Sequence, residues 1–241
     1  MESHEEQPPV DNKASAIDLS TIPGTMIQVI TSPVSFYQGM AKKGGLIEPI
    51  IFLVAMAVLT AVVITLLGLV GFGPVGMMAM GLSGIILIPI FAVIGSFIGA
   101  AILFVIWKII GSSEDYETAY RTTAYTYAYA PVAAVVSGIP YLGGLISTLW
   151  PMVLLALASI HVHGRSPAVS WGVFGILGLL LALMGLSAEH AGRQMVGGMQ
   201  GWSQQMEQKY GDPDQMTPEE AGKALGEIMK GMQQGMQKNG Q

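Results

Sequence analysis

The sequence contains no cysteine, which excludes disulfide bonds, cysteine nucleophiles and cysteine-ligated metals. Charge is scarce as well: Asp, Glu, Lys and Arg make up 11% of the 241 residues, against about 25% in a typical soluble domain. The net charge of -5 offers no basic surface, so no nucleic-acid partner is expected. Since 51% of the residues are hydrophobic, the shortage of charge predicts that membrane lipid surrounds most of the chain.

Three long stretches lack Asp, Glu, Lys and Arg altogether: residues 49–107, 122–164 and 166–188. A charge at the centre of a membrane helix costs about 2.5–3.5 kcal/mol, and one span needs about 20 residues. The stretches therefore have room for two, two and one spans. The sequence predicts an all-α, polytopic membrane bundle with five transmembrane helices. These lie at residues 46–70, 85–110, 116–139, 145–162 and 168–187.

Residues 76–84 follow the first predicted span and are too few to form another, so they are expected to form a loop or a half-helix. Lys and Arg are enriched in the cytoplasmic loops of membrane proteins. With five spans, the basic residues of the short loops all fall on one side of the membrane. We therefore expect a cytoplasmic N-terminus and an extracytoplasmic C-terminus. The basic residues concerned are Lys42, Lys43, Lys108, Arg121 and Arg165.

The third predicted span is the most polar, and its tyrosines alternate with small residues as in a β-strand. A lone strand cannot cross lipid, because its backbone groups would lack partners. We therefore predict a helix, with Ser113 as N-cap and acidic residues in its first turn. Pro131 has no backbone donor, which frees the carbonyl oxygen of Tyr127, so a kink is expected there.

Two interpretations of these tyrosines stay open. In the first, their hydroxyls hydrogen-bond neighbouring helices in the bundle interior. In the second, they line a binding cleft for a lipid or a partner helix at the kink. The candidate binding residues of this span are Tyr120, Tyr125, Tyr127, Tyr129 and Pro131.

Short motifs occur in a fixed order along the chain. SPVSFYQGM precedes the first span, YETAYRTTAYTYAYAP forms much of the third, and GIPYLGG, TLWPMVLL and HVHGRS follow. Over roughly residues 25–187 the chain resembles the Yip (Ypt-interacting protein) membrane family, in its prokaryotic branch. This resemblance implies five helical spans, a cytosolic N-terminus and no enzymatic activity, here in a bacterial inner (cytoplasmic) membrane. Eukaryotic members are linked to vesicle traffic and small GTPases, and their acidic-Leu-Tyr-Gly-Pro motif does not occur here ahead of the first span.

The region before the first span falls into two parts. Residues 1–20 are acidic, contain two prolines and lack the basic start and apolar core of a secretory signal, so a disordered leader is expected. Within residues 21–45, Ser32 and Pro33 predict a helix start. Lys42 and Lys43 are expected to close this helix, which we predict to lie as an interfacial amphipathic helix on the anionic membrane surface.

The tail, residues 188–241, is rich in Met, Gln and Gly. Met195, Met199, Trp202 and Met206 form a heptad-like stripe, and TPEE at 217–220 predicts the start of a second amphipathic helix. Three interpretations stay open: helices packed on the membrane, the bundle or another copy; a soft surface for a protein partner; or thioether ligands for a soft metal, with His190. We expect no resident metal or other cofactor.

Missing motifs and the positions of the charges both favour a binding protein. No phosphate loop, nucleophile elbow or H-E-x-x-H motif occurs, which argues against an enzyme. The charged Glu48, Lys108 and Arg121 lie near span ends, where they can snorkel, so no charge marks an ion path at depth. His161 and His163 are predicted to be interfacial, since alternate helical residues point about 200° apart.

We predict a non-enzymatic integral membrane scaffold or adaptor that binds proteins or lipids through its bundle and tail. The alternative is a transporter or channel for a small neutral substrate near the third span. The small-residue spacing at Gly95 and Gly99 also allows a homo-oligomer.

Overall fold

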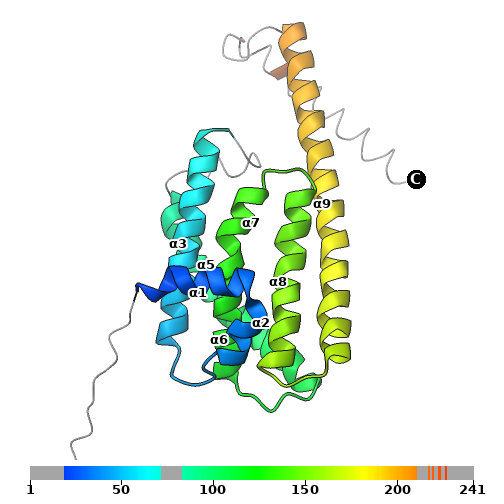
Figure 1. Cartoon of the computed structure of the whole chain (residues 1–241). Helices are drawn as coiled ribbons and strands as arrows, with labels where there is room; N and C mark the ends of the chain where they lie inside the picture. The colour runs from blue at the N-terminus through cyan, green and yellow to red at the C-terminus, as the bar shows by residue number, and fades with distance from the viewer. Residues whose placement is uncertain are drawn as a thin grey trace, which may run out of the picture. The chain divides into compact units, whose positions relative to one another are not determined.

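The computed structural model describes residues 19–71, 83–210, 217, 219, 222, 223 and 226. Across these residues the secondary structure is helical, and none of them lies in a strand. The chain divides into two compact units, one ending at Leu186 and one starting at Ser187. The first unit contains the helical bundle (Figure 1).

Within the described ranges, four helices are long and apolar enough to cross a membrane: α3, α5, α8 and the stretch of α9 from Pro167 to Gly198. They coincide closely with four of the five expected spans. Large apolar side chains on their outer faces are exposed, as hydrocarbon-facing surfaces require. The bounds are α3 (Ile47–Leu69), α5 (Gly84–Ile109), α8 (Leu142–His161) and α9 (Pro167–Tyr210).

The expected third span, 116–139, is helical in three consecutive pieces, α6 (Tyr116–Thr126), the 3₁₀ turn η2 (Tyr127–Tyr129) and α7 (Ala130–Val136). The helix tightens at Tyr127 because Pro131 has no N–H to donate to that carbonyl, and the N–H of Ala130 donates to it instead. A change of helix geometry at Tyr127 is therefore observed, while the kink expected there stays a prediction. The interruption also means that no single helix here is long enough to count as a span by length.

The start of this segment differs from the prediction. Asp115, and not Ser113, is the N-cap: its carboxylate accepts a hydrogen bond from the Thr118 N–H over 3.1 Å. Ser113 is too early because the helix begins only at Tyr116, and the preceding Glu114 is held by Lys42 at 2.7 Å.

The segment lies in the bundle interior, as its polarity predicted. Thr118, Ala119 and Tyr120 are fully buried, and most residues that follow to Pro131 are also buried. The hydroxyls of Thr122 and Thr126 donate to the carbonyl oxygens of Thr118 and Thr122, at 2.9 and 2.8 Å. Because such hydroxyls find partners inside the protein, a polar helix is tolerated at the centre of an apolar bundle.

Two short helices, α1 (Thr21–Thr31) and α2 (Pro33–Gly39), precede the bundle. Pro33 stands in the first turn of α2, as predicted, but the side chain of Ser32 makes no capping hydrogen bond. The predicted helix was too long, since α2 ends at Gly39. Lys42 and Lys43, which were expected in its last turn, instead form ion pairs with Glu114 and Asp115 in the loop before α6. The apolar residues Tyr37 and Met40 are buried against the bundle.

The predicted boundary at residue 188 does not interrupt the helix, because α9 continues to Tyr210. Neither Pro nor a turn motif occurs near residue 188, and Glu189 and Arg193 form an i,i+4 ion pair at 2.6 Å that favours helix. The second tail helix expected from Thr217 lies almost entirely outside the described residues, as do residues 76–82 and the leader up to residue 18.

The PYLGG turn between α7 and α8 requires glycine at position 143. A Cβ atom on Gly143 would lie 2.6 Å from the Cα of Ser137 and would also collide with the Val136 carbonyl oxygen. Tyr141, two residues earlier, adopts a positive φ of 61°. The turn therefore brings the end of α7 against the start of α8 more closely than any side chain at position 143 would permit.

Candidate functional site

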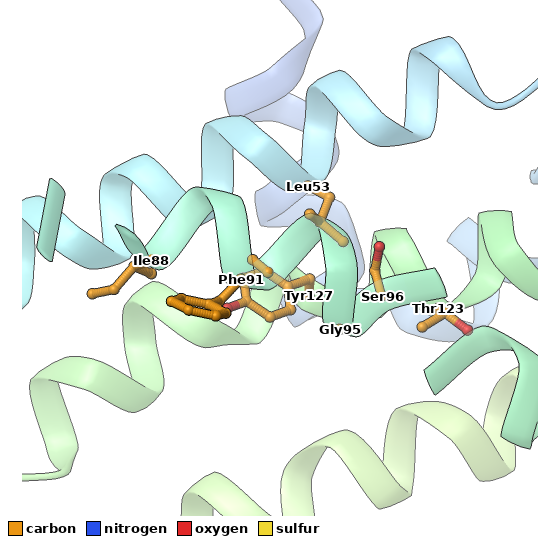
Figure 2. A pocket seen from close by; sticks show the side chains of 8 residues that line it. Leu53, Ile88, Phe91, Gly95, Ser96, Thr123 and Tyr127 are labelled. Atoms are coloured by element: carbon orange, nitrogen blue, oxygen red, sulfur yellow. The ribbon is translucent and has the colours of Figure 1, made fainter. Parts of the chain in front are cut away.

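A groove of about 500 Å³ opens where α3, α5 and the α6–η2 segment meet. Figure 2 shows its side chains along this junction. Its walls are apolar, with three hydroxyl groups among them. The lining residues are Leu53 from α3, Ile88, Phe91, Ala92, Gly95 and Ser96 from α5, Thr123 from α6 and Tyr127 from η2.

Two of the three hydroxyls are engaged within the protein. The Oγ of Ser96 donates to the Val93 carbonyl oxygen at 2.7 Å and lies 3.0 Å from the hydroxyl of Tyr120. Thr123 donates to the Ala119 carbonyl oxygen at 2.8 Å. Within the described part of the chain, the hydroxyl of Tyr127 has no hydrogen-bond partner. The groove therefore offers one available donor and acceptor in an apolar setting.

The small residues of α5 serve two different purposes. Gly99 faces α6, where a Cβ would lie 4.0 Å from the Cγ2 of Thr123. Gly95 borders the groove, and among the described residues no atom outside its own helix backbone and chain neighbours lies within 4 Å of the position that its Cβ would take. The pair that predicted self-association is thus split, with only Gly95 presenting an open surface.

The other tyrosines predicted for a site do not line this groove, although the Tyr129 ring lies edge-on to the Tyr127 ring with centroids 6.3 Å apart. Tyr120 and Tyr125 are buried, and the Tyr125 ring packs against Phe36 and Phe52 with ring centroids 5.2 and 5.1 Å apart. Tyr129 borders a separate cavity of about 100 Å³. Pro131 is buried in the first turn of α7. Tyr120 hydrogen-bonds a neighbouring helix through Ser96 of α5, as the first interpretation of these tyrosines expects.

The candidates of the tail lie in the second unit. Met195 is exposed on α9. The side chains of Met199, Trp202 and Met206 fall outside the described residues. The imidazole of His190 lies 2.8 Å from the Gln194 amide nitrogen. Among the described residues, no group of three or more His, Asp or Glu side chains could hold a metal ion.

An arginine, Arg121, organises the charged end of the bundle in a way that no local sequence pattern predicts. Arg121 was expected to snorkel, but its side chain is only 2% exposed. Its guanidinium donates to the carbonyl oxygens of Ala41 and Gly45 at 2.6 and 2.8 Å, and to the Glu48 carboxylate at 3.0 Å. A buried cation is tolerated here because three acceptors surround it.

Residues 41–48, together with Arg121 and the acidic start of α6, form a clamp. Lys42 pairs with Glu114 at 2.7 Å, Lys43 pairs with Asp115, and the Gly45 N–H donates to Glu117 at 2.7 Å. The hydrogen bond from Lys42 lowers the pKa of the Glu114 carboxyl. The complementary KK and EDYE segments were the available sequence signal, although their separation of about 70 residues gave no reason to pair them.

A second charged-end cluster corrects the prediction that His163 is interfacial. His163 is only 3% exposed, stacks on the Trp107 ring with centroids 3.8 Å apart, and lies 3.0 Å from the Ser112 hydroxyl through Nδ1. Burial lowers the pKa of His163 to about 3. The imidazole is therefore neutral at physiological pH and acts as a packing element between the ends of α5 and α8.

We expect Arg121→Met to loosen the clamp, because two backbone carbonyls and Glu48 would lose their donor. Hydrogen bonds to charged groups contribute about 1.5–3 kcal/mol each, so trypsin should cleave markedly faster after Lys42 and Lys43. Glu48→Gln is the control: the Glu48 side chain is 61% exposed, so its ion pair contributes at most about 1 kcal/mol. Unchanged cleavage in Arg121→Met would contradict the clamp.

The lowered pKa of His163 predicts a pH-dependent stability. The unfolded chain binds a proton below about pH 6.5, whereas the folded protein resists protonation down to about pH 3. The stability contributed by neutral His163 is full above pH 6.5 and is lost as the pH falls below it, by at most about 1.4 kcal/mol per pH unit.

Thermal unfolding midpoints in detergent, measured at pH 7 and pH 5, would test this dependence. The midpoint should fall less in His163→Gln than in the wild type. His161→Gln, which changes a half-buried neighbour, should follow the wild type. Parallel profiles for all three proteins would show that His163 does not cause the dependence.

Comparison with known proteins identifies the family. A model of the Yip1 domain matches residues 27–189, a range that includes the groove and the clamp. No curated protein and no solved structure matches the chain. The match is to the family as a whole, so membership of its prokaryotic branch stays a prediction. Because the match covers more than half of the sequence, the chain belongs to the Yip1 domain family of multi-pass membrane proteins.

Proposed function

We propose that this protein is a non-enzymatic membrane scaffold whose α3–α5–η2 groove binds a transmembrane helix of a partner protein. Membership of a family of membrane proteins supports a non-enzymatic role. The single observation that carries the proposal is the Tyr127 hydroxyl, which borders an apolar groove and has no partner among the described residues.

The depth of Tyr127 favours a peptide over a lipid. Tyr127 lies 11 residues after Tyr116, which is about 16 Å along a helix, or about half of a 30 Å hydrocarbon layer. Acyl chains have no hydrogen-bonding atom at that depth. A partner helix with Ser, Thr, Asn or Gln at its centre does, and such interhelical bonds contribute about 0.6–2 kcal/mol.

The shape of the groove also favours a helix. Gly95 leaves open space above its Cα, and small residues at an interface let two membrane helices approach closely. The apolar side chains of Ile88 and Phe91 on the same helix provide contact area to either side. A helix seated here would thus gain both van der Waals packing and one hydrogen bond.

The five-crossing arrangement belongs to the same proposal. The 21 residues of α6, η2 and α7 measure about 31 Å, which suffices to cross. An interrupted helix is tolerated in a membrane when protein surrounds it, and this segment is largely buried. With five crossings in a bacterial inner membrane, the N-terminus is cytoplasmic and the methionine-rich tail is extracytoplasmic, where it offers a second contact for a protein partner.

The groove is tested by site-specific photocrosslinking in cells. A photoreactive residue at Ile88, in the groove, should give a discrete protein adduct, whereas one at Ile102, exposed elsewhere on α5, should not. Tyr127→Phe should reduce the Ile88 adduct several-fold, and Gly95→Leu should abolish it by filling the groove. Lipid adducts alone, equal at both sites, would contradict a helix partner.

The topology is tested with a single cysteine. Because the chain has none, Ser203→Cys provides one label site in the tail. A membrane-impermeant maleimide should label it in intact cells as fully as in lysed cells. Labelling only after lysis would mean an even number of crossings and would place the tail in the cytoplasm.

A further inference from the structure

One charge-free stretch lies outside the expected spans. From Leu19 to Ala41, between Asp18 and Lys42, no Asp, Glu, Lys or Arg occurs over 23 residues. This length would suffice for one span, but Ser32 and Pro33 divide it into α1 and α2. The stretch therefore has the composition of membrane-embedded chain without the form of a single transmembrane helix.

One face of α1 packs against the bundle. Val29 is fully buried in a cluster with Met56 of α3 and Ala128 of η2. Ile30 borders the smaller cavity beside Val132 of α7 and Ile146 of α8. Ile146 is the fifth residue of α8, counted from the end opposite the charged clamp.

The distance from the clamp gives the depth of α1. Val29 of α1 shares its cluster with Ala128, which lies 12 residues after Tyr116, the first residue of the central segment. At 1.5 Å per residue this is about 18 Å, or slightly more than half of the hydrocarbon thickness. Figure 1 shows α1 crosswise beside the bundle, between the level of α6 and that of α7.

The polar groups of the two helices suit this depth. The Thr126 hydroxyl donates to the Thr122 carbonyl oxygen, so the Tyr37 hydroxyl donates to Thr126 over the 2.9 Å between them. The Thr31 hydroxyl donates to the Ile27 carbonyl oxygen at 2.8 Å. Because these two hydroxyls are satisfied within the protein, neither adds an unpaired polar group to the hydrocarbon layer.

We propose that α1 and α2 form a re-entrant hairpin that reaches half the depth of the bilayer from the charged side and contacts lipid acyl chains. The contact surface is the outer face of α1, which carries no charge and on which Ile27 is 60% exposed. This replaces the prediction of a helix on the membrane surface. It rests on the membrane position of α3, α6–α7 and α8, and does not depend on a helix partner in the groove.

Nitroxide labels at single cysteines test the proposal in phosphatidylcholine vesicles. Ile27→Cys replaces an exposed side chain, so the fold should tolerate the label. Leu59→Cys, exposed near the middle of α3, is the hydrocarbon reference, and Lys43→Cys, at the charged end, is the aqueous reference. Collision with oxygen and with a water-soluble nickel chelate is measured for each label.

The Ile27 label should match Leu59, with an oxygen-to-nickel collision ratio several-fold above that of Lys43. A ratio equal to that of Lys43 would place α1 at the membrane surface and overturn the proposal. Protection from both reagents would also overturn it, because α1 would then face protein and not lipid. Neither result bears on the Tyr127 groove, so the two proposals can fail separately.

Discussion

Inside a membrane, a polar group without a protein partner is costly, and the structure depends on how the segment from Tyr116 to Val136 meets this constraint. Thr122 and Thr126 donate to carbonyl oxygens one turn earlier, and the Tyr120 hydroxyl lies within hydrogen-bond distance of Ser96 of α5. Arg121 finds its acceptors in the chain before α3. The most polar helix can therefore be the most central one, and the apolar surfaces of α3 and α5 are left to face lipid.

A proline near the middle of this segment has two consequences. Without an N–H on Pro131, the backbone tightens into the 3₁₀ turn at Tyr127–Tyr129. Tyr127 and Tyr129, two residues apart, then border different cavities, one against α5 and one against α1 and α8. The same break thus adjoins both the proposed helix-binding groove and the proposed hairpin of α1 and α2.

Much of the architecture was predictable from local composition. The absence of charge located four of the spans closely. The polarity of the third expected span predicted its interior position. The position of Pro131 indicated that the helix geometry changes at Tyr127. The errors arose where long-range contacts competed with local signals. The N-terminal helix stops at Gly39 because Lys42 and Lys43 pair with the loop before α6. The groove was not predictable, since its lining comes from three separate segments.

The sequence by itself determined that the chain is helical and embedded in a membrane, because hydrophobic run length, scarcity of charge and proline position act through neighbouring residues and the solvent. Only the tertiary structure decided which polar groups are paired. Arg121 is buried against a carbonyl oxygen 80 residues away, His163 is stacked on Trp107, and the Tyr127 hydroxyl has no partner among the described residues. Such pairing depends on how distant segments pack, and no local pattern encodes it.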